Sequence, residues 1–70
     1  MTDKLILYTT NGCDVCDRAR AELVAEGTDF EERNVMHDKA WFDEVLKHTI
    51  FVPMVVQGDR VEIGWRGAVG

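Results

Sequence analysis

Proline, cysteine and long apolar runs are all scarce in this sequence. Its 70 residues include one proline and two cysteines, and the longest unbroken run of aliphatic and aromatic residues is Leu5–Tyr8. Two cysteines are too few for the disulfide scaffold that stabilises many small secreted domains. The run is also far shorter than the ~20 apolar residues of a membrane-spanning helix. These shortages exclude a disulfide-rich fold and a transmembrane helix.

Positive charge is in short supply as well. Eight Lys and Arg residues stand against thirteen Asp and Glu, which gives a formal net charge of −5. Binding to nucleic acid or to an anionic membrane depends on clustered positive charge, so neither is an expected partner. The first residues, Met1–Lys4, lack the basic and apolar regions of a secretory signal. We therefore expect a protein of the reducing cytoplasm.

The rest of the composition is typical of a folded domain. Aliphatic, aromatic and cysteine residues make up 46% of the chain and charged residues 30%, which excludes a disordered tail. A chain of this length buries only about 60% of its unfolded surface. We expect residues 1–70 to form a single domain without a linker.

The first half of the chain predicts a strand, a helix and a second strand. An apolar block over residues 4–9 indicates a central strand covered on both faces, and a turn follows over 10–12. Residues 13–26 then predict a helix, and Gly27 is a natural stop for it. The apolar residues that recur every four positions along this helix are Val15, Ala19 and Leu23.

The second strand, over residues 28–35, is expected at an edge of the sheet because it is mostly polar. Its acidic residues are interpreted as a solvated edge: Asp29, Glu31 and Glu32.

Residues 38–48 predict a second helix, with Asp38 as its N-terminal cap. Two pairs of apolar residues four positions apart form a stripe on it: Trp41 with Val45, and Phe42 with Leu46. We interpret both aromatic side chains as core packing.

The last part of the chain predicts an antiparallel hairpin. Residues 54–57 and 60–63 flank Gly58-Asp59, a two-residue loop suited to a tight turn. The element order is therefore β-α-β-α-β-β. This order predicts an α/β fold with a four-stranded mixed sheet and helices on both faces.

Cys13 and Cys16 form a C-x-x-C motif where the first strand gives way to the first helix. Free peptide N–H groups and the helix dipole stabilise a thiolate at a helix N-terminus. One helical turn brings Cys16 back within reach of Cys13, so a mixed disulfide on one residue is resolved by the other. The motif at this junction predicts a redox-active dithiol.

Together these features resemble the glutaredoxins of the thioredoxin-fold superfamily, and the resemblance covers nearly the whole chain. It rests on the strand before the C-x-x-C motif, on Arg18 after it, and on Val52-Pro53 just before the third strand. The resemblance implies that Cys13 attacks a disulfide and that Cys16 resolves it. It also implies that Pro53 is cis and faces the cysteines, with the Val52 backbone offered to the substrate. The implied activity is thiol–disulfide exchange in cell redox homeostasis and electron transport, acting on protein or glutathione mixed disulfides.

The chain departs from the family around its motif. Asp14-Val15 stands between the cysteines, where most dithiol members have Pro-Tyr. Asp14 and the following Asp17 place negative charge near the thiolate, which predicts a Cys13 less acidic than is typical. We expect Asp14 and Arg18 to tune the cysteine pair.

Glutathione is the expected co-substrate, and no tightly bound cofactor is expected. Its carboxylates need cations or backbone donors, for which Gly64, Trp65 and Arg66 are the candidates. Thr10 and Phe51 replace the Lys and Thr that the family often has. Two interpretations therefore stay open for the reductant: glutathione, or a flavoenzyme of the thioredoxin-reductase type.

The family's usual C-terminal helix is absent from this sequence. Two explanations stay open: the loss leaves apolar sheet surface for a homodimer, or this sequence stops short of the helix. Trp65 is expected to be either a platform for substrate or a filler of the gap. The partners expected are disulfide-bearing proteins.

A metal-binding module is the alternative function for the same cysteines. An iron–sulfur cluster bridging two protomers needs only thiolate ligands. A copper-carrier domain has a different element order. A zinc site needs four ligands, and His37 and His48 lie at opposite ends of the second predicted helix. No metal ligand is therefore predicted.

Overall fold

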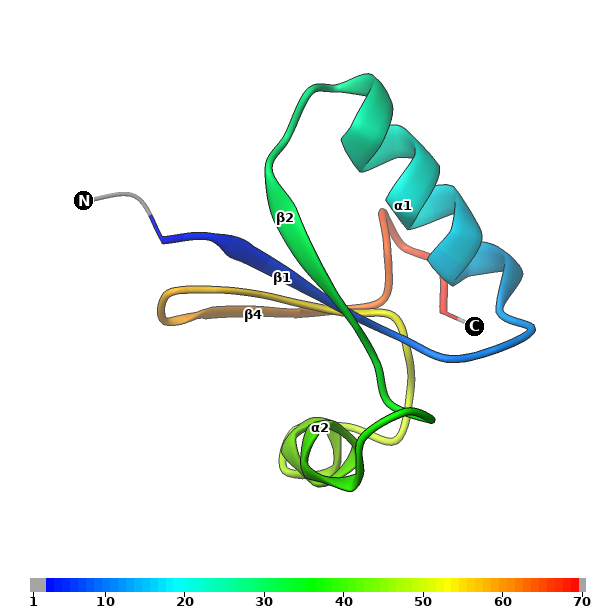
Figure 1. The fold of residues 1–70 in the computed structure, drawn as a ribbon, viewed down its shortest axis with the longest axis vertical. Coiled ribbons are helices and arrows are strands. Elements are labelled where there is room, and N and C mark those ends of the chain that lie inside the picture. Colours follow the sequence, from blue (N-terminus) through cyan, green and yellow to red (C-terminus); the bar gives the residue numbers. More distant parts are fainter. Residues whose placement is uncertain (1–2, 70) are drawn as a thin grey trace.

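The computed structural model describes residues 3–69, which form a four-stranded sheet with one helix on each face (Figure 1). The order along the chain is that predicted from the sequence. The elements are β1 (Leu5–Thr9), α1 (Asp14–Ala25), β2 (Phe30–Asn34), α2 (Lys39–Leu46), β3 (Met54–Gln57) and β4 (Arg60–Ile63).

The strands lie in the order β2-β1-β3-β4. β1 pairs in parallel with β2 and antiparallel with β3, and β3 and β4 form the antiparallel hairpin around Gly58. The prediction of a central first strand and an edge second strand is therefore confirmed. The carboxyl end of β1 leads directly into the loop that carries Cys13.

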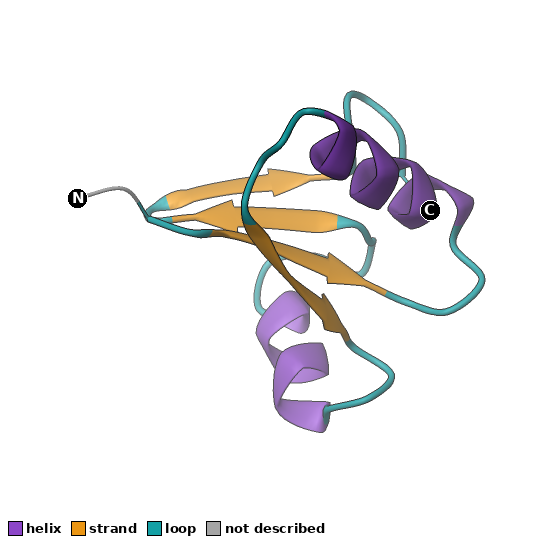
Figure 2. Cartoon of the chain, turned by 45° about the horizontal axis from the view of Figure 1, so that its top comes forward, coloured by secondary structure: helices purple, strands orange, loops and turns teal. Residues whose placement is uncertain are grey.

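Alternation along β1 divides the core into two layers. Leu7 points toward α1 and packs with Ala19, Leu23, Val55 and Trp65. Its neighbour Tyr8 points the other way and packs under α2; the other buried members of that cluster are Val35, Val45 and Met54. Because successive side chains of a strand face opposite sides, one apolar strand serves both layers. Figure 2 shows the two helices on opposite sides of the sheet.

Both helices begin and end one or two residues inside their predicted limits. Asp38 caps α2 by accepting a hydrogen bond from the Ala40 N–H at 2.8 Å. Gly27 ends α1 with a φ of +71°, and the next N–H, of Thr28, reaches back to the Leu23 carbonyl at 3.0 Å. This is the left-handed helix ending that glycine favours. No helix within residues 3–69 has the length and apolar character to cross a membrane.

Candidate active site

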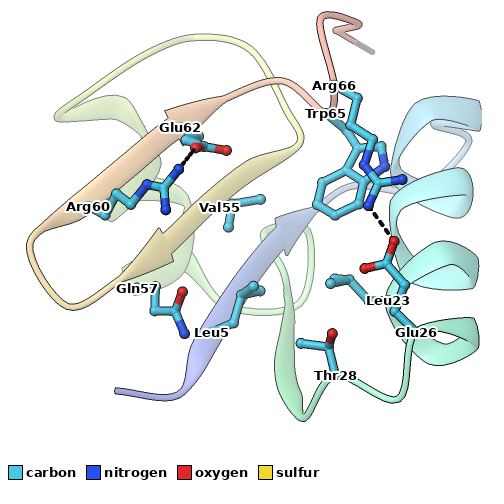
Figure 3. Close-up of a pocket in the computed structure, with 10 residues that line it drawn as sticks. All are labelled: Leu5, Leu23, Glu26, Thr28, Val55, Gln57, Arg60, Glu62, Trp65 and Arg66. Atoms are coloured by element: carbon cyan, nitrogen blue, oxygen red, sulfur yellow. Dashed lines mark hydrogen bonds and ion pairs between the residues drawn. The ribbon is translucent and has the colours of Figure 1, made fainter. Parts of the chain in front are cut away.

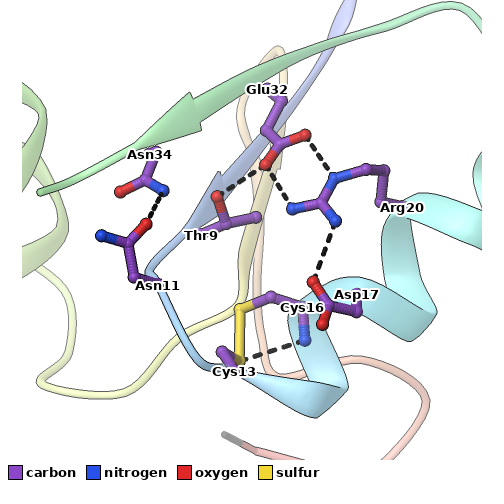
Figure 4. The surroundings of a disulfide bond; sticks show 8 residues. All are labelled: Thr9, Asn11, Cys13, Cys16, Asp17, Arg20, Glu32 and Asn34. Atoms are coloured by element: carbon purple, nitrogen blue, oxygen red, sulfur yellow. Dashed lines mark hydrogen bonds and ion pairs between the residues drawn. A yellow bond between two sulfur atoms is a disulfide. The ribbon is translucent and has the colours of Figure 1, made fainter. Parts of the chain in front are cut away.

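Cys13 and Cys16 are joined by a disulfide at the N-terminus of α1, with their Cα atoms 5.2 Å apart. Cys13 is the N-cap residue, and its sulfur accepts a hydrogen bond from the Cys16 N–H at 3.1 Å (Figure 4). A thiolate at this position gains the same N–H bond and the positive end of the helix dipole. The first turn of α1 therefore stabilises negative charge on Cys13.

The two sulfur-bearing residues differ in exposure. Cys16 is fully buried and Cys13 is 5% exposed. An incoming disulfide can therefore reach only Cys13, and it must approach closely along the small surface that Cys13 presents. This difference fits the roles that the resemblance implies, with Cys13 attacking and Cys16 resolving.

A charged network lies beside the disulfide and connects α1 to both strands of the parallel pair (Figure 4). Arg20 donates two hydrogen bonds of 2.6 Å to the Glu32 carboxylate and one of 2.9 Å to Asp17. Glu32 also accepts a bond of 2.9 Å from the hydroxyl of Thr9, a fully buried residue at the end of β1. The network fixes the first turns of α1 against the sheet.

The interpretation of Glu32 as part of a solvated edge was wrong. Its side chain is 28% exposed, and it points from β2 toward Arg20. The hydrogen bonds from Arg20 hold the pKa of Glu32 below its usual range. Burial raises this pKa in part, and the smaller effect of the Thr9 hydroxyl lowers it. The same pairing raises the pKa of Arg20 above an already high value.

The carboxylates near the cysteines are not equivalent. Asp17 is paired with Arg20, which offsets its negative charge. Asp14 lies exposed in the first turn of α1 and has no ion-pair partner within residues 3–69. Arg18 is also exposed, and it is the one Lys or Arg side chain in the described chain that forms no ion pair. Asp14 and Arg18 are therefore the free charges that flank Cys16.

The Val52-Pro53 peptide bond is cis, as the resemblance implies. Pro53 is buried, and its carbonyl accepts a hydrogen bond of 2.7 Å from the Gly64 N–H. Val52 is half-buried, and it lines a groove of about 180 Å³ together with Thr10 of the redox loop. The groove therefore lies beside the residue before the cis-proline and the residue that follows β1.

The groove continues into an exposed apolar surface that sequence analysis missed. Phe42 and Leu46 of α2 are 43% and 49% exposed, and Ile50 in the next loop is 80% exposed. The prediction that Phe42 packs in the core is wrong: α2 buries only the row that includes Val45. We give the name α2 apolar surface to the exposed apolar residues of α2 and of the segments on either side of it, of which Phe42, Leu46 and Ile50 line the groove: Met36, Phe42, Leu46, Ile50 and Phe51.

Trp65 and Arg66, predicted to bind substrate, lie on the α1 side of the sheet (Figure 3). Trp65 is 8% exposed and belongs to the core cluster under α1. The Arg66 guanidinium lies over the Trp65 ring, with its Cζ 4.9 Å from the ring centroid, and it forms ion pairs with Glu22 and Glu26. Those bonds raise the pKa of Arg66, the Glu26 bond foremost.

The structure therefore does not bring Arg66 to the disulfide. Glu22 lies nine residues beyond Cys13, about 13 Å along the axis of α1. Of the two roles proposed for Trp65, the structure favours filling the gap in the core. A cavity of about 310 Å³ remains beside it, lined by Leu5, Leu23, Glu26, Thr28, Val55, Gln57, Arg60, Glu62, Trp65 and Arg66.

Gly64 is needed for the chain to turn at this point. Its φ is +87°, and a Cβ there would lie 2.5 Å from the Ala68 carbonyl oxygen. The Trp65 N–H then donates a hydrogen bond of 2.7 Å to the Ala68 carbonyl, and the Ala68 N–H donates one of 2.9 Å to the Trp65 carbonyl. This tight turn places Arg66 over α1. The sequence pattern after β4 does not predict such a turn, so the position of Arg66 was not expected.

Metal ligands do not gather in the described part of the chain. His37 and His48 are exposed and lie beyond opposite ends of α2. Between residues 3 and 69, no group of three or more His, Cys, Asp or Glu side chains is placed to share a metal ion.

The family model described as Glutaredoxin matches residues 5–62, which include both helices, β1 to β3 and all but the last residue of β4. The chain belongs to the glutaredoxin family. No curated protein matches it significantly.

The solved structures that are similar to this member of the family include a glutaredoxin and a glutaredoxin-like protein. Glutaredoxin Grx-1 from Archaeoglobus fulgidus is 26% identical, with a TM-score of 0.75 over 90% of this chain and 76% of that one. NrdH-redoxin from Escherichia coli, a glutaredoxin-like protein with a thioredoxin-like activity profile, is 28% identical. Its TM-score is 0.79 over 90% of this chain and 84% of its own. The thioredoxin-like fold predicted from the sequence is thereby confirmed.

Proposed function

We propose that the chain is a thiol–disulfide oxidoreductase that reduces disulfides in polypeptide substrates. The observation that carries this proposal is the Cys13–Cys16 disulfide at the mouth of α1, of which only Cys13 has exposed surface. Family membership supports the same reaction class.

The reaction begins from the reduced form of the pair. The Cys13 thiolate attacks one sulfur of the substrate disulfide, so a mixed disulfide forms and the other substrate sulfur leaves as a thiolate. Cys16 loses its proton and attacks the Cys13 sulfur, which releases the second substrate thiolate. The substrate gains two electrons and the protein is left with the Cys13–Cys16 disulfide, the state that the structure describes.

The surroundings of Cys13 favour a polypeptide over a small anionic disulfide. The groove at Val52 opens onto the α2 apolar surface, which can receive apolar side chains next to a substrate cysteine. The carboxylates of glutathione need cations or backbone donors, and seven of the eight Lys and Arg side chains are already paired with carboxylates. Within residues 3–69 Arg18 alone forms no ion pair, so the site offers little unpaired positive charge and is rich in apolar surface.

The reductant follows from the same features. A flavoenzyme of the thioredoxin-reductase type presents a protein surface to the pair, and this fits the α2 apolar surface better than glutathione does. The thioredoxin-like activity profile of the similar Escherichia coli protein agrees with this choice. Glutathione as co-substrate, a homodimer and a location in the cytoplasm stay predictions from the sequence.

A comparison of reductants on the cysteine variants tests the proposal. We expect the wild type to reduce insulin disulfides and Cys13→Ser to lose all of this activity. Cys16→Ser should instead accumulate a mixed disulfide on Cys13, visible by mass under non-reducing conditions. The oxidised wild type should be reduced faster by the flavoenzyme than by glutathione. Insulin reduction by Cys13→Ser at the wild-type rate would overturn the proposed reaction, and faster reduction by glutathione would overturn the reductant.

A further inference from the structure

Asn11-Gly12 occupies the exposed turn between β1 and the disulfide. Both residues are exposed, and the space where a Cβ of Gly12 would lie is empty to beyond 4 Å. Gly12 has a φ of +67°, a conformation that favours glycine. The Gly12 N–H donates no hydrogen bond to any residue from 3 to 69. The Gly12 backbone nitrogen is therefore unhindered, and it directly follows Asn11, which lies two residues before Cys13.

We propose that Asn11 is a site of spontaneous deamidation that introduces a carboxylate into the redox loop. The Gly12 backbone nitrogen attacks Cγ of Asn11, its proton passes to solvent, and the bond from Cγ to Nδ2 breaks to release ammonia. A five-membered succinimide results, and water opens it at either carbonyl to give aspartate or isoaspartate. The net reaction converts an amide and water into a carboxylate and ammonium, with no change in oxidation state.

The chain holds its own control at its second asparagine, Asn34. The nitrogen that would attack there belongs to Val35, which is buried and β-branched and donates to the Thr9 carbonyl at 2.9 Å. The Asn34 side-chain oxygen accepts a bond of 2.9 Å from the Met36 N–H. The attacking atom and the side-chain amide are thus both engaged at Asn34, whereas the attacking nitrogen is free at Asn11.

The aspartate product fits the loop that contains it. The Asn34 amide donates a hydrogen bond of 2.8 Å to the Asn11 side-chain oxygen (Figure 4). A carboxylate at position 11 still accepts this bond, and a bond to a charged acceptor is stronger. Deamidation to aspartate therefore keeps this contact and adds a negative charge two residues before Cys13.

The added charge acts on the same thiolate as the charges of α1. Asp17 is paired with Arg20, whereas Asp14 and Arg18 form no ion pair with any residue from 3 to 69. A further carboxylate two residues before Cys13 disfavours its ionised form. We expect the deamidated protein to react more slowly with thiol-alkylating reagents.

Peptide mapping of the aged full chain tests the modification itself. The protein is held in mildly alkaline buffer at physiological temperature and digested with trypsin, which places Asn11 and Asn34 in separate peptides. We expect the mass change from amide to carboxylate to grow in the Asn11 peptide, with isoaspartate present, while the Asn34 peptide stays unchanged. Asn11→Gln should abolish the change. An unchanged Asn11 peptide, or equal change in both peptides, would overturn the proposal.

Alkylation of the reduced protein tests the consequence. Asn11→Asp is compared with Asn11→Gln, which keeps the loop neutral, and the rate at Cys13 is followed in the Cys16→Ser background. We expect the aspartate variant to react at least about twofold more slowly. Equal rates would overturn the effect on the thiolate. Neither measurement depends on disulfide reductase activity, so each stands apart from the test of the proposed function.

Discussion

α1 and α2 cover opposite faces of one sheet, but they are held to it in different ways. α1 buries Cys16, Ala19 and Leu23, whereas α2 buries only Val45. Besides the Asp17–Arg20 pair within the helix, α1 has ion pairs to other parts of the chain, from Arg20 to β2 and from Arg66 to Glu22 and Glu26. Those of α2 stay within one turn of that helix and its C-cap: Lys39–Asp43 and Lys47–Glu44.

This difference assigns separate tasks to the two faces. Redox chemistry needs two sulfurs at a fixed distance. The helix α1, which carries them, is held to the sheet by the Arg20–Glu32 ion pair and by packing against Trp65. Recognition of varied protein surfaces needs exposed apolar area, which α2 provides at Phe42 and Leu46. The face that packs less completely is therefore the one suited to receive a partner.

Removing the Trp65 side chain is the strongest test of this difference between α1 and α2. Trp65→Ala empties the core under α1, where the side chain packs with Leu7 and Leu23. We expect a loss of about 3–5 kcal/mol in the free energy of unfolding, a large share of the total for so small a domain. Urea denaturation followed by circular dichroism measures the loss.

Two control variants make the result specific. Phe42→Ala removes an aromatic ring of the other face, and it should cost less than about 1 kcal/mol because the ring is 43% exposed. Trp65→Phe should keep most of the stability, because the indole Nε1 finds no hydrogen-bond partner within residues 3–69. Equal losses for Trp65→Ala and Phe42→Ala would contradict the assignment of tasks.

The charged network of α1 predicts a loss that depends on pH. Glu32→Gln keeps the size of the side chain but removes its charge, so the paired bonds from Arg20 weaken. We expect a loss of about 1–2 kcal/mol in the free energy of unfolding at neutral pH. The measurement is urea denaturation of both proteins over a series of pH values.

The direction of the pH effect follows from the pKa of Glu32. Its value in the folded protein lies below the ordinary 4.5, so its stabilisation is complete above the unfolded value. It is lost as the pH falls through the folded value. The wild type and Glu32→Gln should therefore become equally stable in acid. Glu62→Gln, in an exposed pair with Arg60, is the matched control and should cost little at any pH. A Glu32→Gln loss that persists unchanged in acid would show that charge is not its cause.

Most of the fold followed from local patterns in the sequence. The four-residue recurrence of α1, its stop at Gly27 and the hairpin around Gly58-Asp59 each depend on neighbours in the chain. The C-x-x-C motif predicted its own disulfide for the same reason, since one helical turn closes the distance. Local chemistry was sufficient wherever the partners lie within a few residues.

The features that the sequence did not predict are contacts between segments far apart in the chain. Glu32 could be paired with Arg20 only by knowing that Leu7 and Glu32 are partners in the parallel strands. Arg66 reaches α1 through a turn in which its own φ is +49°, a conformation that no apolar pattern reveals. Phe42 belongs to one of two apolar rows on α2, and only the position of the helix over the sheet decides which row is buried.

The α2 apolar surface predicts the smallest effect and the most selective one. In the double variant Phe42→Ser/Leu46→Ser, the KM for a protein disulfide should rise about five- to tenfold, because each exposed side chain contributes under about 1 kcal/mol to binding. Turnover of a small neutral disulfide should stay unchanged, since it needs only Cys13. Val24→Ser is the matched control, because Val24 lies on α1 and is 66% exposed. An equal rise in KM for both substrates would place these side chains in support of the disulfide itself, and an equal effect of Val24→Ser would mean that exposed apolar area anywhere suffices. A rise confined to the protein substrate and to the α2 variant would separate the face that reacts from the face that recognises.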